Sequence, residues 1–261
     1  MKGRHGPATV TKVFQRALEV RHFLPISPDC LTPWIELSVN NYGLNAESRN
    51  LNAEVSGFFF EVMRLHKQIY LVRHGEVDAP AGVFLGKTDV GLSAEGREHG
   101  GWLANRFLGM PVDRCFCSPL LRAQQTASYI AESNGLRVET HDALREIDFG
   151  RWEGRHFDEI EANEPHKVQE WCSSPLDFTF PEGDTVNLFI DRVATFFQWF
   201  RQEEGENLLL VTHGGVIRTL LFQLLKLNPE DQFKFEVARG SLSIVKLFGD
   251  EAILTRLNDH G

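Results

Sequence analysis

The sequence lacks any apolar run close to the roughly 20 residues that a membrane-spanning helix needs; its longest aromatic run is the triplet Phe58-Phe59-Phe60. Its first residues are polar and contain no apolar centre, so we expect no secretory signal peptide. Basic residues are outnumbered as well: the chain has 27 Lys and Arg against 36 Asp and Glu, which gives a formal net charge of −9. Because nucleic-acid binding needs a basic surface, we expect neither a nucleic-acid nor a membrane partner.

Cysteine is rare as well, with four residues in the chain and no spacing typical of metal ligands. Cys115 and Cys117 lie two apart in a predicted strand, so they share one face. Small packing residues in a reducing compartment account for all four, and we expect a cytoplasmic protein. The sequence indicates no oligomeric state.

The first 62 residues differ in charge from the rest of the chain. They hold six basic and six acidic residues, so the whole net charge falls on residues 63–261. One amphipathic helix near Val10–Leu18 is the only regular element that they predict. We expect a poorly ordered extension at 1–62, or a true start at Met63, followed by one domain at 63–261. An organelle-targeting peptide fits less well, because the segment contains few serines.

From Lys67 onward, predicted strands and helices alternate. Strands are predicted at 68–73, 112–117, 136–140 and 208–212, with further strand-like runs at 234–237, 243–247 and 253–256. Helices are predicted at 93–107, 118–133, 186–201 and 216–225, with a shorter one near 157–162. Ser93 and Ser118 are the expected N-caps, and Gly135 ends the second helix. This order predicts an α/β fold of three layers, a mostly parallel central sheet with helices on both faces.

Two predicted strands end in a histidine followed by glycine. Arg73-His74-Gly75 follows the run Ile69–Val72, and His213-Gly214-Gly215 follows Leu208–Thr212. Because open α/β sheets bind ligands at the carboxyl ends of their strands, we expect both histidines at one edge of the sheet. The two glycines allow a close backbone approach at a helix N-terminus. Arg4-His5-Gly6 repeats the tripeptide without a strand before it, and we interpret that copy as coincidence.

Arg122 and Glu146 lie between these two strands in the sequence. Arg122 falls in the first turns of a predicted helix, where an anionic ligand would explain a cation placed against the helix dipole. Glu146 lies in the loop 144–154, whose carboxylates, aromatics and glycines are typical of a site wall. Taken singly, each residue fits an ordinary surface or turn role. Together, at one predicted edge, they favour an anion site for a phosphoryl group.

Five motifs carry a resemblance to a known family: LVRHGE, GKTDVGLSAEGREHG, SPLLRAQQTA, LREIDFGRWEG and VTHGGVIR. In order and spacing they resemble the histidine phosphatase superfamily, which has the phosphoglycerate-mutase-like fold, over about Lys67 to Arg256. The resemblance implies that His74 is a nucleophile forming a phosphohistidine and that Glu146 protonates the leaving group and then helps to activate water. It further implies that the phosphoryl group is bound by Arg73, Arg122, His213 and Gly214. Arg and His would supply the positive charge, so no metal and no cofactor are expected.

The loop 144–154 resembles the phosphatase branch of the superfamily, especially α-ribazole phosphatases of cobalamin assembly and broad-specificity sugar-phosphate phosphatases. We therefore expect a phosphomonoesterase acting on a small phosphorylated metabolite, with α-ribazole 5′-phosphate as one candidate. A cofactor-dependent phosphoglycerate mutase and a catalytically silent phosphoryl-binding protein of the same fold are the alternatives.

Two departures from the family pattern leave the substrate open. Pro80 stands near the place where many relatives have a pocket Asn, and the usual Gly-Glu-Ser turn is Gly183-Asp184-Thr185 here. Aromatic residues after the loop fit either a cavity wall for an aromatic or ribose-bearing leaving group or ordinary packing. They are Trp152, Phe157, Trp171, Phe178 and Phe180.

Overall fold

The computed structural model describes residues 66–229, 231 and 234–261. The expectations for the extension 1–62, its helix near Val10–Leu18, the Arg4-His5-Gly6 copy and the start at Met63 lie outside these residues.

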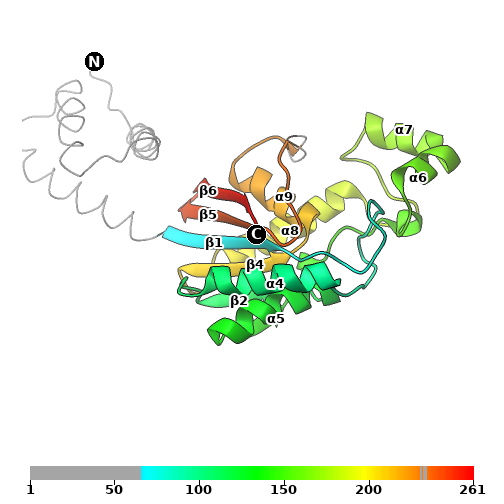
Figure 1. The fold of residues 1–261 in the computed structure, drawn as a ribbon. Helices are drawn as coiled ribbons and strands as arrows, with labels where there is room; N and C mark the ends of the chain where they lie inside the picture. The colour runs from blue at the N-terminus through cyan, green and yellow to red at the C-terminus, as the bar shows by residue number, and fades with distance from the viewer. Residues whose placement is uncertain (1–65, 230, 232–233) are drawn as a thin grey trace, which may run out of the picture. The chain divides into compact units, whose positions relative to one another are not determined.

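A six-stranded mixed sheet, ordered β3-β2-β4-β1-β5-β6, forms the centre of the described chain (Figure 1). Four strands are parallel: β3 (Val138–Thr140), β2 (Arg114–Cys117), β4 (Asn207–Thr212) and β1 (His66–Arg73). The last two, β5 (Leu242–Phe248) and β6 (Glu251–Asp259), are antiparallel. The predicted, mostly parallel α/β sheet is confirmed.

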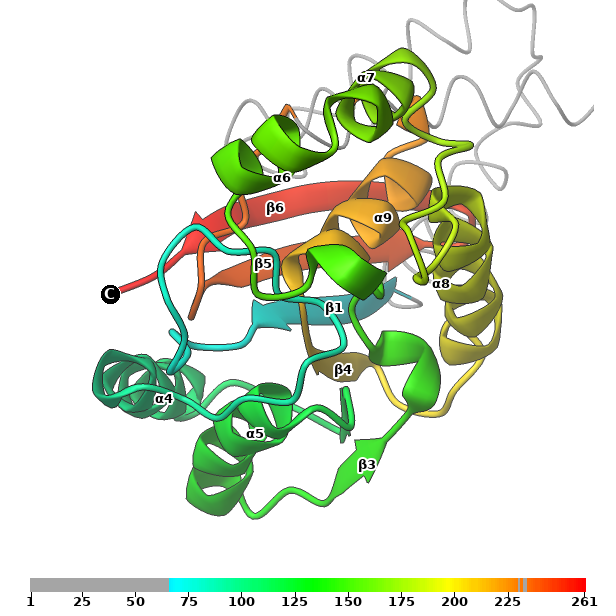
Figure 2. The same ribbon diagram turned by 90° about the vertical axis from the view of Figure 1, so that its right-hand side faces the viewer.

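Helices cover both faces of the sheet, as Figures 1 and 2 show. On one face lie α4 (Ala94–Phe107) and α5 (Leu121–Asn134); on the other lie α8 (Val186–Phe200) and α9 (Gly214–Leu224). Two shorter helices, α6 (Phe157–Asn163) and α7 (Pro165–Ser173), form a pair that stands apart from these layers. Short 3₁₀ turns occur at Asp142–Leu144 and Gly150–Trp152. No helix in the described ranges is long and apolar enough to cross a membrane.

The central strands are apolar along their whole length because both of their faces are covered. In β1, Ile69 and Leu71 pack in the cluster with α8 and α9, whereas Tyr70 and Val72 pack in the cluster with α4 and α5. This period of two places Arg73 and His74, which follow directly, on opposite sides of the strand end. Cys115 and Cys117 both join the α4–α5 cluster, so the prediction that they share a face is confirmed.

Two of the predicted helix boundaries match their capping signals. Ser93 caps α4 by accepting from the amide of Gly96, and Gly135 ends α5 in the left-handed conformation with φ 65°. The predicted start of α5 at Ser118 was wrong, because the helix begins at Leu121 after an extended Leu120. The Ser118 hydroxyl bonds the ring of His213 at 2.8 Å, a tertiary contact that competes with capping.

Two further expectations need correction. Residues 234–237 form no strand; Val237 is buried in a loop, where its carbonyl accepts from Arg73. The apolar character of Val237, which suggested a strand, is therefore explained by its tertiary packing. The helix α7 was not predicted at all, although Pro165 stands in its first turn, where proline is favoured.

Candidate active site

His74 lies directly after β1, and the sheet itself fixes its position. Arg73 pairs in register with Thr212 of β4, so His74 and His213 occupy the next positions of two neighbouring parallel strands. The amide of His74 donates to the carbonyl of Thr212 at 2.9 Å, and its carbonyl accepts from Gly240 at 2.9 Å. The ring centroids of the two histidines are 5.1 Å apart. The predicted meeting of the two imidazoles is thus observed.

The His74 ring is oriented by one local hydrogen bond. Its Nδ1 lies 2.8 Å from the carbonyl oxygen of Gly75. A carbonyl can only accept, so Nδ1 carries the proton and Nε2 keeps its lone pair. Burial, followed by the charges of Arg73 and Arg122, lowers the pKa of His74 well below its ordinary value of 6.5. The ring is therefore a neutral imidazole with a free nucleophilic nitrogen.

His213 is fully buried and is held from the other side of the site. Its Nε2 lies 2.8 Å from the hydroxyl of Ser118, while its Nδ1 has no hydrogen-bond partner. Burial, then the neighbouring His74 and Arg122, lowers the pKa of His213 well below 6.5. If Ser118 donates to Nε2, the free Nδ1–H is available as a donor to a ligand.

Arg73 and Arg122 each use their terminal nitrogens on backbone carbonyls. Arg73 Nη1 donates to Val237 at 2.6 Å. Arg122, which is fully buried, donates from Nη1 to Thr88 at 2.8 Å and from Nη2 to Gly86 at 2.6 Å. Burial and the charge of Arg239 lower the pKa of Arg73 to about 10, so both guanidiniums stay charged at neutral pH.

Three buried nitrogens around His74 have no partner in the protein: Arg73 Nε, Arg122 Nε and, as a donor in the tautomer just described, His213 Nδ1. A buried donor without an acceptor costs about 1–3 kcal/mol, so three such atoms in one place call for a ligand that supplies several acceptors. An anion with several oxygens meets that requirement, and a phosphoryl group is the obvious case.

Glu146 reaches the same edge from the loop that follows the turn Asp142–Leu144. Its Oε2 accepts from the amide of Gly215 at 2.9 Å, and its Oε1 accepts from Ile147 at 3.1 Å. A Cβ atom at Gly215 would overlap this carboxylate, so the second glycine of the pair is required for the contact. At Gly214, a Cβ atom would lie 3.3 Å from Arg73 Cζ, so this glycine allows the close approach of that guanidinium.

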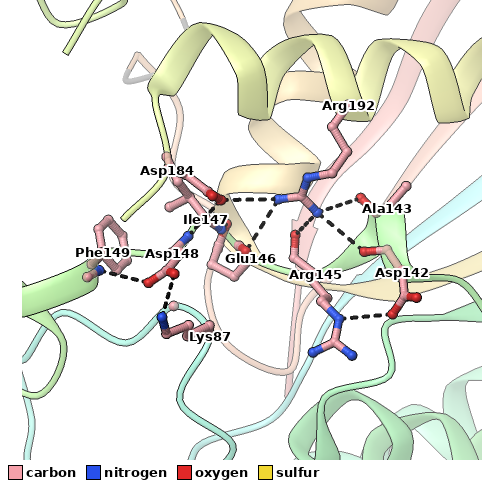
Figure 3. Close-up of polar contacts among 12 residues, drawn as sticks. Lys87, Asp142, Ala143, Arg145, Glu146, Ile147, Asp148, Phe149, Asp184 and Arg192 are labelled. Atoms are coloured by element: carbon pink, nitrogen blue, oxygen red, sulfur yellow. Dashed lines mark hydrogen bonds and ion pairs between the residues drawn. The ribbon is translucent and has the colours of Figure 1, made fainter. Parts of the chain in front are cut away.

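Arg192, on α8, holds the loop that carries Glu146 (Figure 3). Its Nη1 donates to the carbonyls of Asp142, Ala143 and Arg145 at 3.3, 3.1 and 2.9 Å, and its Nη2 lies 3.4 Å from the carbonyl of Glu146. Asp184 completes the arrangement: it forms an ion pair with Arg192 at 3.8 Å and accepts from the amide of Asp148 at 3.0 Å. The atypical turn Gly183-Asp184-Thr185 therefore braces this loop.

Glu153 performs a comparable task for the segment 86–88 that Arg122 binds. Its carboxylate accepts from the amides of Gly86, Lys87 and Thr88, from the hydroxyl of Thr88 and from the amide of Phe149. Ser118, Arg192 and Glu153 were all missed by the sequence analysis. Their sequence context gave no signal that singled them out: Arg192, for example, follows Asp191 in a helix that also contains Asn187 and Gln198.

The aromatic residues that were considered as a cavity wall pack against one another instead. Trp152, Phe178 and Phe180 are almost fully buried, with ring centroids 5.2–5.5 Å apart. Trp171 is half-buried against the same group, and Phe157 is exposed. The three buried rings are therefore ordinary core residues and do not line a cavity.

No group of three or more His, Cys, Asp or Glu side chains suited to a metal ion occurs in the described ranges. The expectation of a site without metal or cofactor stays a prediction.

The fold and the site together define an α/β protein with a cluster of buried histidine and arginine side chains at the carboxyl edge of its sheet. The chain belongs to the histidine phosphatase superfamily (branch 1), whose sequence model matches residues 69–260. It is a phosphatase, and its substrate is a small phosphorylated metabolite.

Named relatives support this family assignment at modest identity. The chain is 30% identical over 193 residues to the adenosylcobalamin/α-ribazole phosphatase of Escherichia coli (strain K12), covering 73% of this chain and 95% of the relative. It is 28% identical over 193 residues to phosphoserine phosphatase 1 of Hydrogenobacter thermophilus, covering 73% and 92%. The crystal structure of the α-ribazole phosphatase from Shigella flexneri matches with a TM-score of 0.68 and 28% identity, covering 74% of this chain and 96% of that one.

Proposed function

We propose that this protein hydrolyses a phosphate monoester without a metal ion, through a phosphohistidine formed on Nε2 of His74. One observation carries the proposal. A neutral imidazole with a free Nε2 lies beside three buried donors, Arg73 Nε, Arg122 Nε and His213 Nδ1, that have no partner in the protein. These donors match the equatorial oxygens of a phosphoryl group in the transition state.

In the first step, the lone pair on His74 Nε2 attacks phosphorus, and the bond between phosphorus and the leaving-group oxygen breaks. Glu146, in its protonated form, gives its proton to that oxygen. A positioned acid contributes about 10²–10⁴ in rate when the leaving group is an alkoxide. Arg73, Arg122 and His213 bind the phosphoryl oxygens throughout the transfer.

In the second step, a water molecule attacks the phosphohistidine, and the phosphorus–nitrogen bond breaks to restore His74. The Glu146 carboxylate accepts the proton from that water, and inorganic phosphate leaves. The backbone amides of Gly215 and Ile147 donate to the carboxyl group of Glu146 and keep it at the N-terminus of α9 in both steps.

The test is hydrolysis of p-nitrophenyl phosphate by the full chain in the presence of a chelator. The wild-type protein should hydrolyse this substrate, and His74→Ala should lose essentially all activity. The matched control is His166→Ala, which removes an exposed histidine on α7 and should act as wild type. Rapid quenching of wild type should trap a phosphorylated peptide that contains His74, labile in acid and stable in base. Dependence on an added metal, or turnover by His74→Ala, would contradict the proposal.

The relatives supply two classes of leaving group for the substrate panel. α-Ribazole 5′-phosphate, our candidate from the sequence, has a neutral ribose leaving group, whereas phosphoserine has a charged one. Release of inorganic phosphate from 3-phosphoglycerate would support hydrolysis, and formation of an isomer would support the mutase alternative. The absence of turnover on any phosphate ester would support the silent phosphoryl-binding alternative.

A further inference from the structure

Arg218 is a cation at the edge of the site to which the proposed chemistry gives no role. It lies on α9, and no hydrogen bond or ion pair to its guanidinium occurs within the described chain. Its Nε is buried without a partner. Other cations around the site have carboxylate partners: Lys87 with Asp148, Arg145 with Asp142, Arg192 with Asp184, and Arg239 with Glu76.

The position of Arg218 follows from the helix. It lies four residues after Gly214, so the two share one face of α9. A Cβ atom at Gly214 would be 3.3 Å from Arg73 Cζ and 3.5 Å from Arg218 Nη1. These two guanidinium atoms are therefore within about 7 Å of each other, across the glycine. The charge of Arg218 is also among the causes that lower the pKa of Arg73, as expected for two cations at this distance, whereas the charge of Glu146 raises it.

The three guanidiniums of the site differ in what is left for each of them to bind. Arg73, Arg122 and Arg218 form no ion pair with a carboxylate of the described residues. The charge of Glu146 acts on Arg73 and Arg122 at longer range, and those of Asp89 and Glu153 also act on Arg122. A phosphoryl group bound to Arg73 and Arg122 leaves Arg218 without an anion to bind, and the like charges of Arg73 and Arg218 repel at this distance.

We propose that Arg218 binds a carboxylate on the leaving group of the substrate, so that the natural substrate is a phosphorylated hydroxy acid or amino acid. This assignment rests on the proposed phosphatase function and deepens it. A carboxylate accepts two parallel hydrogen bonds from a guanidinium, which fixes the leaving group as well as neutralising the charge. The benzimidazole riboside of α-ribazole phosphate offers no such group.

The experiment compares two substrates that differ only at this point. 3-Phosphoglycerate carries a carboxylate where glycerol 3-phosphate carries a hydroxymethyl group. Wild type should prefer 3-phosphoglycerate by about 10- to 100-fold in kcat/KM, the range expected for a hydrogen-bonded charge pair. In Arg218→Met this preference should fall close to one, mainly through KM, while Arg218→Lys should retain part of it. O-phosphoserine and O-phosphoethanolamine form a second pair for the same comparison.

Arg137→Met is the matched control, because it removes one exposed positive charge between α5 and β3. It should keep the preference of wild type. Equal kcat/KM for the paired substrates in wild type, or an equal loss on both in Arg218→Met, would overturn the assignment while leaving the phosphatase function intact. Failure of wild type to hydrolyse either substrate or p-nitrophenyl phosphate would instead overturn the proposed function itself. Thermal unfolding of each variant confirms that the folded protein is compared.

Discussion

At the scale of the residue, the site depends on which nitrogen or oxygen atoms are occupied by the protein and which are free. The Gly75 carbonyl occupies Nδ1 of His74, and Ser118 occupies Nε2 of His213. Each contact leaves the opposite ring nitrogen for the ligand. The two imidazoles are therefore suited to different tasks, attack by the first and donation by the second, although both follow a strand end.

Glu146 provides the residue-scale prediction. Glu146→Gln keeps an oxygen that can accept from Gly215 but removes the proton needed by the leaving group. We expect kcat for a substrate with an alkoxide leaving group to fall by about 10²–10⁴. The loss should be much smaller for formation of the phosphohistidine from p-nitrophenyl phosphate, because nitrophenolate leaves without a proton. Single-turnover kinetics with both substrates measures this difference, and an equal loss of rate on both would exclude Glu146 as the acid.

At the scale of the element, side chains from helices and loops position the proposed catalytic groups through hydrogen bonds to the backbone. The side chain of Arg192 leaves α8 and binds four carbonyls of residues 142–146, so the helix holds the loop that carries Glu146 (Figure 3). Glu153 holds the segment 86–88 through amides in the same manner. Neither residue is expected to touch the substrate.

Arg192→Met should therefore impair catalysis by misplacing Glu146. We expect a decrease in kcat of about 10–100-fold on an alkoxide-leaving substrate, with a smaller effect on p-nitrophenyl phosphate. The unpaired carbonyls should also lower the free energy of unfolding by about 1–3 kcal/mol. Arg201→Met, at the end of the same helix, removes an ion pair with Asp250 and is the control for stability alone. The same ratio between substrates in both variants would show that Arg192 has only a structural role.

At the scale of the whole molecule, the folded protein keeps His74 and His213 buried and uncharged, which makes its free energy of unfolding depend on pH. The pKa values of His74 and His213 lie well below 6.5 in the folded protein, mainly because both rings are buried. The unfolded chain takes up protons at these residues as the pH falls through about 6.5, whereas the folded protein does not. Their contribution to stability is therefore complete above that pH and decreases below it, until the folded pKa is reached.

The free energy of unfolding should thus fall by up to about 1.4 kcal/mol per pH unit and per histidine below pH 6.5. Urea denaturation of wild type and of a His74→Asn, His213→Asn variant between about pH 7.5 and pH 5 measures the effect. The carboxylates titrate in both proteins, so the difference between the two slopes isolates the histidines. Identical slopes would show that the rings are already protonated in the folded protein, or are not buried.

The sequence by itself determined where the main strands lie and what stands at their ends. Short β-branched apolar runs such as Ile69–Val72 and Leu208–Val211 predict strands covered on both faces, and their alternation with helices predicts a mostly parallel sheet. Parallel strands end at one edge, so the sequence placed Arg73, His74 and His213 at that edge, and the pairing of β1 with β4 then brought the two histidines together. Local signals also set the start of α4 at Ser93 and the end of α5 at Gly135.

Only the tertiary structure decided the contacts between residues that lie far apart in the sequence. Ser118 bonds His213 rather than capping α5, Arg192 holds the Glu146 loop, and Arg218 faces Arg73 across Gly214. No periodicity or capping rule encodes such pairs, because each depends on how several chain segments close around a common core. The tertiary packing also explains why Val237 is buried in a loop rather than in a strand, and why the aromatic side chains around Trp152 pack in the core. The sequence thus placed His74 and His213 directly after two strands, while the orientation of their rings was decided by burial and by the need to satisfy buried polar groups.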